Sequence, residues 1–399
     1  MNNCLIVQSG GPTAVVNSIL TGIIEESYIN NKIEKIYGAY QGIYGLLNKK
    51  YVDLSYLTKK ELNFLGSTPG ASLGSWRKKV TEEEINMIIT HMNSFHIKTV
   101  YFVGGNGTMQ LAHMINQVAN ESIFQLKVIG IPNTIDNDIV GTEHTPGYGS
   151  AAKFLNTCVM EVGQDLTSLW DNQKITIIES MGRNTGWLAA STALAKNKNN
   201  TFPNLIYIPE IPFSKENFLS DVQKVYEKQG YALIVVSEGL RDEQGEIINN
   251  DYALNKNKTS GLNVGGVSAY LSRIIEDNTK YSSRYISPGV WQRTSMRFAS
   301  RTDIQESYRI GQEAVRQTWD ELSGKMITIS SQKNKNEMTF NSEYLDKIAG
   351  YEKKVPKHWY DKEKKNVTEE FINYVFPLIQ GEVQMPMEKG VPIFSDLLH

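Results

Sequence analysis

Two acidic residues, Asp136 and Asp138, lie two positions apart in the segment Pro132–Asp138, directly after the apolar run Val128–Ile131. A carboxylate in such a pair can accept the proton of an attacking hydroxyl group, while its neighbour holds a divalent metal or orients the first. Aspartate and asparagine in loops also cap helices and stabilise turns, which is the simpler interpretation. The pair becomes a candidate catalytic site because two glycine-rich segments that could bind phosphate occur in the same chain.

Two glycine-rich segments follow other apolar runs and precede segments with helical spacing. The first is Ser9–Thr13 (Ser-Gly-Gly-Pro-Thr), and the second is Gly104–Thr108 (Gly-Gly-Asn-Gly-Thr). Glycines let a phosphate approach the backbone, and free N–H groups at a helix N-terminus favour an anion. A tight turn without a ligand explains the first segment equally well, whereas the glycines of the second exceed what a turn requires. Neither segment matches GxxxxGK[ST] or GxGxxG, which argues against a P-loop or a dinucleotide fingerprint.

Polar side chains also follow the later apolar runs. Arg183 comes after Ile175–Ile178, and its guanidinium offers a planar fork of donors to a phosphoryl group, although a surface salt bridge is the simpler explanation. Glu238 comes after Leu233–Val236 and could bind sugar hydroxyls or cap a turn. A further apolar segment is framed by two arginines and an amide, Arg284, Gln292 and Arg293. Their spacing suits a sugar phosphate, although isolated arginines usually only solvate a surface.

Short apolar runs rich in β-branched residues must position these groups. Such continuous runs are typical of strands that are buried on both faces, as in parallel sheets covered by helices. Apolar stripes with helical spacing follow the first two runs, at Val15–Ile24 and Leu111–Val118. The sequence therefore predicts an α/β fold, in which ligands gather at the carboxyl ends of the strands. The runs are Cys4–Val7, Thr99–Val103, Val128–Ile131, Ile175–Ile178 and Leu233–Val236.

Composition narrows the class of protein. The chain has 399 residues, with 41 basic and 43 acidic side chains and a formal charge of −2, so nucleic acid is not an expected partner. Hydrophobic residues make up 40% and charged residues 21%, which is enough apolar material for a core. At about 150 residues per domain, the length predicts two or three domains. The segment Ser330–Asn341 is largely polar and indicates an exposed loop or hairpin, and Glu352–Glu370 indicates a peripheral helical appendage.

Cysteine usage and hydropathy indicate the compartment. Two cysteines, Cys4 and Cys158, cannot form a disulfide framework. The apolar run near the N-terminus has strand length and does not resemble a signal peptide. No stretch approaches the roughly 18 consecutive apolar residues of a membrane span. We therefore expect a cytoplasmic protein without membrane partners.

The motifs taken together resemble the phosphofructokinase family. They occur in family order from about residue 4 to about residue 315, and the first and fifth are most similar to the branch that contains pyrophosphate-dependent members. The matching segments are QSGGPTAVVNS (8–18), GSWRK (74–78), GGNGT (104–108), PNTIDNDI (132–139), TPGYGSAAK (145–153), ESMGRNTGW (179–187), SEG (237–239), GGVSAYL (265–271) and WQR (291–293).

This resemblance implies two Rossmann-like α/β domains with mainly parallel sheets and an active site in the cleft between them. A phosphoryl-donor domain would comprise residues 1–149 plus about 294–345, and a sugar-phosphate domain residues 150–293. Residues 346–399 would form a C-terminal helical appendage. The implied activity is glycolytic transfer of a phosphoryl group to the C1 hydroxyl of fructose 6-phosphate with Mg²⁺ as cofactor, giving fructose 1,6-bisphosphate.

The resemblance also implies a role for each matching residue. Asp136 would take the proton from the C1 hydroxyl with Asp138 beside it, while Arg183 and Arg77 would stabilise charge on the transferring group. The donor phosphates would contact Gly11, Arg77, Lys78, Gly105, Asn106, Gly107, Thr108 and Asn133. The sugar phosphate would contact Thr134, Asp136, Lys174, Met181, Gly182, Arg183, Glu238, Arg284, Gln292 and Arg293. Lys174 and Arg284 would reach in from a neighbouring subunit, which implies a homodimer or homotetramer.

Several positions depart from the family pattern. Asn106 replaces an aspartate that helps to hold Mg²⁺, so the metal site would be Asn106 and Asp138 with water and donor phosphates. Val290 replaces a histidine or tyrosine that contacts the 6-phosphate, and Asn184 also departs from the usual residue, so another sugar phosphate is an alternative acceptor. The loss of a metal ligand at Asn106 also allows a catalytically silent regulatory homologue that binds sugar phosphate or nucleotide.

The phosphoryl donor is a separate question. Pyrophosphate-dependent members carry an aspartate at the position of Gly107 and a lysine at the position of Asn133. Without that carboxylate there is room for a nucleotide, and without that lysine a phosphate leaving group lacks a positive charge. These two positions slightly favour ATP, whereas the branch resemblance favours pyrophosphate.

Overall fold

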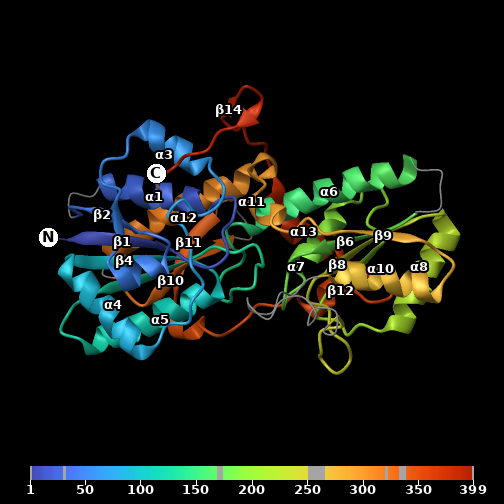
Figure 1. Ribbon diagram of the computed structural model, residues 1–399, viewed down its shortest axis with the longest axis horizontal. Coiled ribbons are helices and arrows are strands. Elements are labelled where there is room, and N and C mark those ends of the chain that lie inside the picture. The colour runs from blue at the N-terminus through green and yellow to red at the C-terminus, as the bar shows by residue number, and fades with distance from the viewer. Residues whose placement is uncertain are drawn as a thin grey trace. The chain divides into compact units, whose positions relative to one another are not determined.

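The computed structural model describes residues 2–29, 33–168, 174–249, 266–319, 322–331 and 338–397 (Figure 1). The chain forms two compact units. Unit 1 contains Met1–Ser150, Arg293–Lys353 and Gln380–His399, and unit 2 contains Ala151–Gln292 and Lys354–Ile379. Residues 346–399 therefore do not group as one body, because 354–379 belong to unit 2 and the remainder to unit 1.

Unit 1 is built on a seven-stranded sheet with the order β11-β10-β5-β4-β1-β2-β3. All neighbouring strands pair in parallel except the two edge strands β3 and β11, which are antiparallel to β2 and β10. The predicted strands are confirmed, and the polar segment 330–341 overlaps the β10–β11 hairpin, with 332–337 outside the described residues. The strands are β1 (Asn3–Gln8), β2 (Ile36–Ala39), β3 (Tyr51–Asp53), β4 (Ile97–Gly104), β5 (Lys127–Pro132), β10 (Lys325–Ser331) and β11 (Met338–Tyr344).

Helices cover both faces of this sheet (Figure 1). Alternate residues of β1 face opposite cores: Leu5 packs with α4 and α5, whereas Ile6 packs with α1 and α12. The axes of α1 and α12 pass so close that a Cβ at Gly22 would lie 2.1 Å from the Tyr308 carbonyl oxygen. The helices are α1 (Val16–Ile29), α2 (Ile43–Asn48), α3 (Lys59–Gly66), α4 (Glu82–Ser94), α5 (Asn106–Glu121) and α12 (Arg301–Trp319), with 3-10 turns η2 (Met296–Phe298) and η3 (Leu345–Lys347).

Unit 2 contains a parallel four-stranded sheet with the order β7-β8-β6-β9. The strands are β6 (Ile175–Ser180), β7 (Leu205–Tyr207), β8 (Ala232–Ser237) and β9 (Ser283–Ile286). The helices are α6 (Tyr148–Ser168, which begins in unit 1), α7 (Trp187–Ser191), α8 (Lys215–Gln229), α10 (Val267–Asn278) and α11 (Trp291–Thr294, which ends in unit 1), with the 3-10 turn η1 (Thr192–Ala195). Gly265, the first residue of one matching motif, lies outside the described residues.

The C-terminal segment differs from the expected helical appendage. Residues 352–370 form the turn η4 (Lys357–Trp359) and the short pair β12 (Tyr360–Asp361) and β13 (Asn366–Val367) before α13 (Glu369–Val375) begins. Aromatic packing explains why this segment joins unit 2, because the Phe371 ring stacks on Trp187 with centroids 5.9 Å apart. The turn η5 (Phe376–Ile379) and the hairpin β14 (Met387–Glu388) and β15 (Val391–Pro392) follow.

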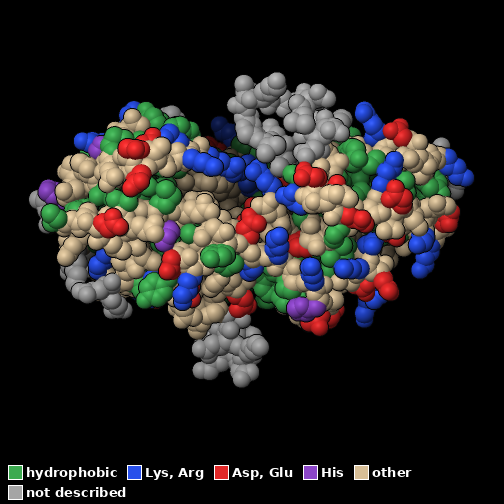
Figure 2. Space-filling view, turned by 90° about the horizontal axis from the view of Figure 1, so that it is seen from below, with side chains coloured by type: hydrophobic (Ala, Val, Ile, Leu, Met, Phe, Trp, Pro, Cys, Tyr) green, Lys and Arg blue, Asp and Glu red, His purple; other side chains and the backbone are tan. Residues whose placement is uncertain are grey.

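The exterior agrees with the composition. Acidic and basic side chains both occur on the face shown in Figure 2, in keeping with the 43 acidic and 41 basic residues of the chain. Within the described ranges, none of the helices combines the length and apolarity that a bilayer span requires. The two α/β sheets with mainly parallel pairing confirm the predicted fold class.

Candidate active site

Three predicted turns meet at the carboxyl ends of the adjacent parallel strands β1, β4 and β5. Hydrogen bonds tie them to one another. The Thr108 hydroxyl donates to the Ser9 carbonyl oxygen at 3.2 Å, and the Asn133 amide donates to the Gly104 carbonyl oxygen at 2.8 Å. The Thr13 hydroxyl donates to Asn133 Oδ1 at 2.8 Å. Asn133 thus ties the two glycine turns together, since its buried side chain binds the first turn and its backbone N–H binds the second.

The second turn leads directly into α5, which begins at Asn106 after Gly105. Gly105 has no side chain to cap this 16-residue helix, and an uncapped helix N-terminus favours an anion. A Cβ added at Gly107 would find no heavy atom of the described residues within 4 Å. The space beside Gly107 that the sequence analysis assumed is therefore open in the structure.

The first turn lies against two arginines. A Cβ at Gly11 would lie 3.1 Å from Arg77 Nη2 and 3.3 Å from Arg293 Nη1. Arg77 is exposed, and its segment is fastened to the turn by the Ser75 hydroxyl, which donates to the Gly10 carbonyl oxygen at 2.8 Å. Both guanidinium groups and the turn belong to unit 1. Arg293 therefore lies among the predicted donor-binding residues, although the family resemblance assigns it to the sugar phosphate.

Two buried amides that no motif singled out for a role hold the segment before Arg77. Gln8 Nε2 donates to Asn17 Oδ1 at 3.0 Å, and the Leu73 amide donates to Gln8 Oε1 at 3.0 Å. Asn17 Nδ2 donates to the carbonyl oxygens of Thr68 and Gly70, each at 2.7 Å. Both amides occur in the first matching motif, but its sequence did not indicate what they bind.

Lys78, another predicted donor contact, forms an ion pair with Glu84 in the first turn of α4. The Glu84 side chain also accepts from the Thr81 amide as part of a capping box. In this structure Lys78 is thus engaged within unit 1.

The acidic loop carries the two predicted catalytic carboxylates. The Asp136 amide donates to Thr134 Oγ1 at 3.2 Å, and the Thr134 amide donates to the Pro146 carbonyl oxygen at 3.0 Å, so the loop folds back on the segment that follows it. Burial raises the pKa of Asp138 to about 7, and the neighbouring charge of Asp136 adds to the rise. A hydrogen bond from Asn106 partly offsets this shift.

The two predicted metal ligands contact each other. Asn106 Nδ2 donates to Asp138 Oδ2 at 2.8 Å. The amide oxygen of Asn106 and the second carboxylate oxygen of Asp138, both Oδ1, are buried and lack a hydrogen-bond partner among the described residues. Two such oxygens fit a hard divalent cation. No cluster of three acidic, histidine or cysteine ligands occurs in the described part of the chain, so the remaining ligands of an ion here would be water and substrate oxygens.

Asp303 on α12 binds the segment that follows the acidic loop, and no sequence motif identified this residue. Its Oδ1 accepts from the Gly147 amide at 2.9 Å, and its Oδ2 accepts from the Ser150 amide at 2.9 Å. The segment held in this way returns to the acidic loop, where the Thr145 hydroxyl donates to the Thr134 carbonyl oxygen at 2.7 Å. An acidic residue within an amphipathic helix carries no local signal for such a contact.

In unit 2, four predicted sugar-binding residues come together at the carboxyl ends of β6 and β8. The Met181 amide donates to Gln292 Oε1 at 2.8 Å, and the Gly182 amide donates to Glu238 Oε1 at 3.3 Å. Gly182 has a φ of +128° and its Cβ would lie 2.4 Å from the Thr185 carbonyl oxygen, so this position requires glycine. The following residue, Arg183, is exposed.

The loop after Arg183 is fixed by Glu210, which the sequence analysis missed. The Glu210 carboxylate accepts from the Gly186 amide at 3.0 and 3.1 Å and from the Val355 amide at 3.0 Å. Burial raises the pKa of Glu210. Glu179, by contrast, accepts from the Ser268 amide at 2.8 Å and so caps α10.

Lys174 and Arg284 do not join this group within one chain. Lys174 immediately precedes β6, whereas the sugar-binding residues follow the other end of that strand. Arg284 pairs in register with Thr176, donates to its hydroxyl at 2.9 Å and forms an ion pair with Asp165. Their action from a neighbouring subunit stays a prediction.

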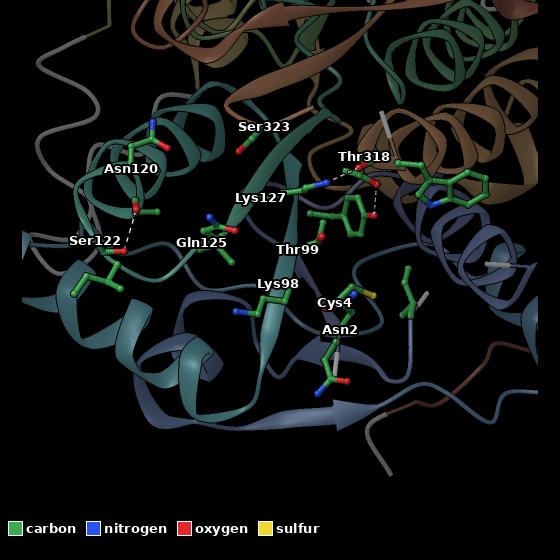
Figure 3. A pocket seen from close by; sticks show the side chains of 17 residues that line it. Asn2, Cys4, Lys98, Thr99, Asn120, Ser122, Gln125, Lys127, Thr318 and Ser323 are labelled. Atoms are coloured by element: carbon green, nitrogen blue, oxygen red, sulfur yellow. Dashed lines mark hydrogen bonds between the residues drawn. The ribbon is translucent and has the colours of Figure 1, made fainter. Parts of the chain in front are cut away.

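A cavity of about 910 Å³ lies at the amino ends of β1, β4 and β5 (Figure 3). None of its described lining residues is a predicted site residue. Its Lys127 ammonium donates to the Thr318 carbonyl oxygen at 2.9 Å, near the C-terminus of α12. This cavity therefore lies at the opposite ends of these strands from the three turns.

Comparisons with known proteins agree with the geometry. Residues 3–318 match the family model described as phosphofructokinase. Pyrophosphate–fructose 6-phosphate 1-phosphotransferase from Halomonas elongata is 31% identical over 404 residues, which cover 99% of this chain and 96% of that protein. Sulfofructose kinase from Alkalicoccus urumqiensis is 32% identical over 324 residues, which cover 81% of this chain and 82% of that protein. The crystal structure of pyrophosphate-dependent phosphofructokinase from Marinobacter aquaeolei superimposes with a TM-score of 0.89 at 29% identity, covering 99% and 96%.

Proposed function

The chain belongs to the phosphofructokinase family, and we propose that it transfers a phosphoryl group from pyrophosphate to the C1 hydroxyl of fructose 6-phosphate. The main support for this proposal is that the two glycine turns and the loop of Asp136 and Asp138 lie together at the carboxyl ends of β1, β4 and β5. Phosphate-binding backbone groups and a candidate base thereby come from three adjacent strands. Fructose 1,6-bisphosphate and inorganic phosphate are the products.

Each group has a defined part in the transfer. Asp136 accepts the proton of the C1 hydroxyl as its oxygen forms a bond to phosphorus, while the bridging P–O bond of the donor breaks and phosphate leaves. Arg77, beside Gly11, stabilises charge on the donor phosphates. We assign the same task to Arg183 of unit 2. Met181, Gly182 and Glu238 bind the sugar.

Mg²⁺ is the proposed cofactor. Asn106 Oδ1 and Asp138 Oδ1, the two buried oxygens without partners among the described residues, would hold it. When bound, Mg²⁺ supplies charge neutralisation for the phosphate oxygens. Asn106 offers a neutral oxygen in place of a carboxylate, so we expect the donor phosphates to contribute a large share of the affinity.

Similarity along nearly the whole chain supports pyrophosphate as the donor. The Halomonas elongata relative and the Marinobacter aquaeolei structure, both pyrophosphate-dependent by name, each align with 99% of the chain. The open space at Gly107 had slightly favoured ATP, but open space permits a nucleotide without providing contacts for one. We therefore place pyrophosphate first and keep ATP as the alternative.

The test is a side-by-side assay of the purified protein with fructose 6-phosphate and Mg²⁺, supplying pyrophosphate or ATP and detecting fructose 1,6-bisphosphate. We expect turnover with pyrophosphate. Asp136→Asn should remain folded and lose at least about 100-fold in kcat, since it removes the base, whereas the surface variant Asp53→Asn should retain activity. An Asp136→Asn enzyme with more than about a tenth of wild-type activity would contradict the base assignment. Sugar binding without turnover under either donor would indicate a regulatory homologue.

A second acceptor has specific support. Val290 stands where the family carries a 6-phosphate contact, and one relative of 32% identity is a sulfofructose kinase. Sulfofructose, a fructose with a sulfo group, is therefore the second candidate acceptor. The assay should include it at matched concentration, and a kcat/KM higher for sulfofructose than for fructose 6-phosphate would move the assignment to that substrate.

We also propose a homodimer or homotetramer, because Lys174 and Arg284 lie apart from the sugar-binding residues of their own sheet. Light scattering coupled to size exclusion would give the mass. A monomer with full activity would remove these two residues from the site.

A further inference from the structure

Lys353 contacts the acidic loop from a part of the chain beyond residue 318, where the match to the family model ends. Its ammonium donates to the carbonyl oxygens of Glu143 at 2.8 Å and Thr142 at 3.2 Å, and to Asn137 Oδ1 at 3.3 Å. Its backbone amide donates to the Asp138 carbonyl oxygen at 2.7 Å. All of these residues belong to unit 1.

We propose that Lys353 is a positioning residue that holds the loop 134–145 so that Asp136 and Asp138 face their substrates and metal. This inference rests on the proposed function, because it assigns to Lys353 the support of the groups that would carry out the transfer.

The contacts of Asn137 show how one lysine can orient both carboxylates. Asn137 lies between Asp136 and Asp138 with a φ of +52°, in the left-handed region that few non-glycine residues adopt. Its Oδ1 accepts from the Thr145 amide at 3.1 Å as well as from Lys353. A change at this oxygen would therefore alter the backbone at the point from which the two carboxylates diverge.

The backbone around Lys353 also pairs with this loop. Ile139 and Glu352 form an antiparallel bridge, directly beside the bond between the Lys353 amide and Asp138. Two backbone connections and one side chain thus join residues 352–353 to residues 137–143. Residues 352–353 are therefore bonded to the loop through their backbone as well as through the lysine side chain.

The chemistry of the group suits an ammonium ion in particular. Three oxygen acceptors, Asn137 Oδ1 and the carbonyl oxygens of Thr142 and Glu143, match the three N–H donors of a lysine ammonium. Burial lowers the pKa of Lys353 to about 7, and the negative charges of Asp138 and Glu143 counteract part of this shift. A methionine of similar length would leave the two carbonyl oxygens and the asparagine without this donor.

The decisive comparison uses Lys353→Met, which keeps the stem and removes the charge, with Lys357→Met as the matched control on an exposed residue. We expect kcat to fall about 100-fold while KM for the sugar changes less than about threefold, because the loop carries the base and the residues to which the Lys353 side chain donates, Asn137, Thr142 and Glu143, are not predicted sugar contacts. Amide hydrogen exchange should accelerate in residues 134–145 of Lys353→Met, and the control should match wild type in both measurements.

Chemical restoration separates positioning from general stabilisation. Lys353→Cys in a Cys158→Ser background, alkylated with 2-bromoethylamine, regains an ammonium at nearly the original distance, whereas iodoacetamide adds a neutral group. Recovery of at least about tenfold in kcat with the first reagent only is the expected result. Equal recovery with both reagents, a kcat of Lys353→Met within threefold of wild type, or unchanged exchange in 134–145 would overturn the proposal. If wild type lacked turnover with every donor, the proposed function would fail, and the exchange comparison would still decide whether Lys353 orders the loop.

Discussion

Asn106 donates its Nδ2 hydrogen to Asp138 Oδ2 at 2.8 Å, and the remaining oxygen of each side chain is buried without a partner among the described residues. The hydrogen bond fixes the orientation of the amide, because only Nδ2 can donate. Neither Oδ1 atom is occupied by a hydrogen bond from the described residues. Under the proposed function, Asn106 would thereby offer Mg²⁺ a neutral oxygen ligand beside a carboxylate.

Replacing Asn106 with aspartate should strengthen metal binding. Asn106→Asp removes the amide donor and adds a second negative charge beside Asp138, which Mg²⁺ would neutralise. We expect the Mg²⁺ concentration for half-maximal activity at pH 8 to fall at least about threefold, as measured by titrating Mg²⁺ at saturating substrates. Unchanged or weaker Mg²⁺ activation would show that the two oxygens do not bind the metal.

The raised pKa of Asp138 predicts how stability depends on pH. The pKa is about 7 in the folded protein against an ordinary value of 3.8, so between these values the folded state keeps a proton that the unfolded state has lost. The contribution of Asp138 to the free energy of unfolding is therefore most favourable below about pH 4, declines as the pH rises to about 7 and then levels off. Urea unfolding without Mg²⁺ from pH 4.5 to 8 should show this decline. Asp138→Asn should flatten it and Asp53→Asn should not; equal slopes in all three proteins would contradict the assignment.

Two adjacent glycines should respond differently to alanine. Gly10 has a φ of +88°, so Gly10→Ala strains the backbone and should cost about 1 kcal/mol or more of stability. Gly11→Ala should leave stability nearly unchanged but push against Arg77 and Arg293, whose nitrogens would lie 3.1 and 3.3 Å from the new Cβ. We expect the donor KM of Gly11→Ala to rise about tenfold with little change in the sugar KM. Similar melting curves and similar donor KM values for both variants would refute this division.

Gly107 offers a direct test of donor choice. Since no described heavy atom lies within 4 Å of the position that a Cβ would take there, Gly107→Asp should fold normally. The added carboxylate would repel and obstruct the α-phosphate of a nucleotide, so any activity with ATP should fall at least about tenfold while activity with pyrophosphate changes less. The ratio of kcat/KM for the two donors measures this effect, and Gly105→Ala is the control for added volume in the same turn. An ATP preference that survives Gly107→Asp would show that position 107 does not govern the donor.

The amino-acid sequence alone determined the central strands of the two sheets and the chemistry of the candidate residues. Continuous apolar runs such as Val128–Ile131 predicted strands of a parallel sheet because burial on both faces leaves no polar alternation. The glycines of Gly104–Thr108 and the pair Asp136 and Asp138 identified the candidate site, because backbone approach and acid–base chemistry require those residue types. In each case the signal lies within a few neighbouring residues.

Only the tertiary structure decided which single polar residues support that site. Arg293 lies beside Arg77 and Gly11. Lys353 contacts the acidic loop across 210 residues of sequence, and Asp303 contacts the segment that follows this loop across 156 residues. Such contacts depend on how strands and helices pack. A lone lysine or aspartate in a polar or amphipathic segment has the same local pattern whether it faces solvent or a catalytic loop, so its role appears only when the chain is folded.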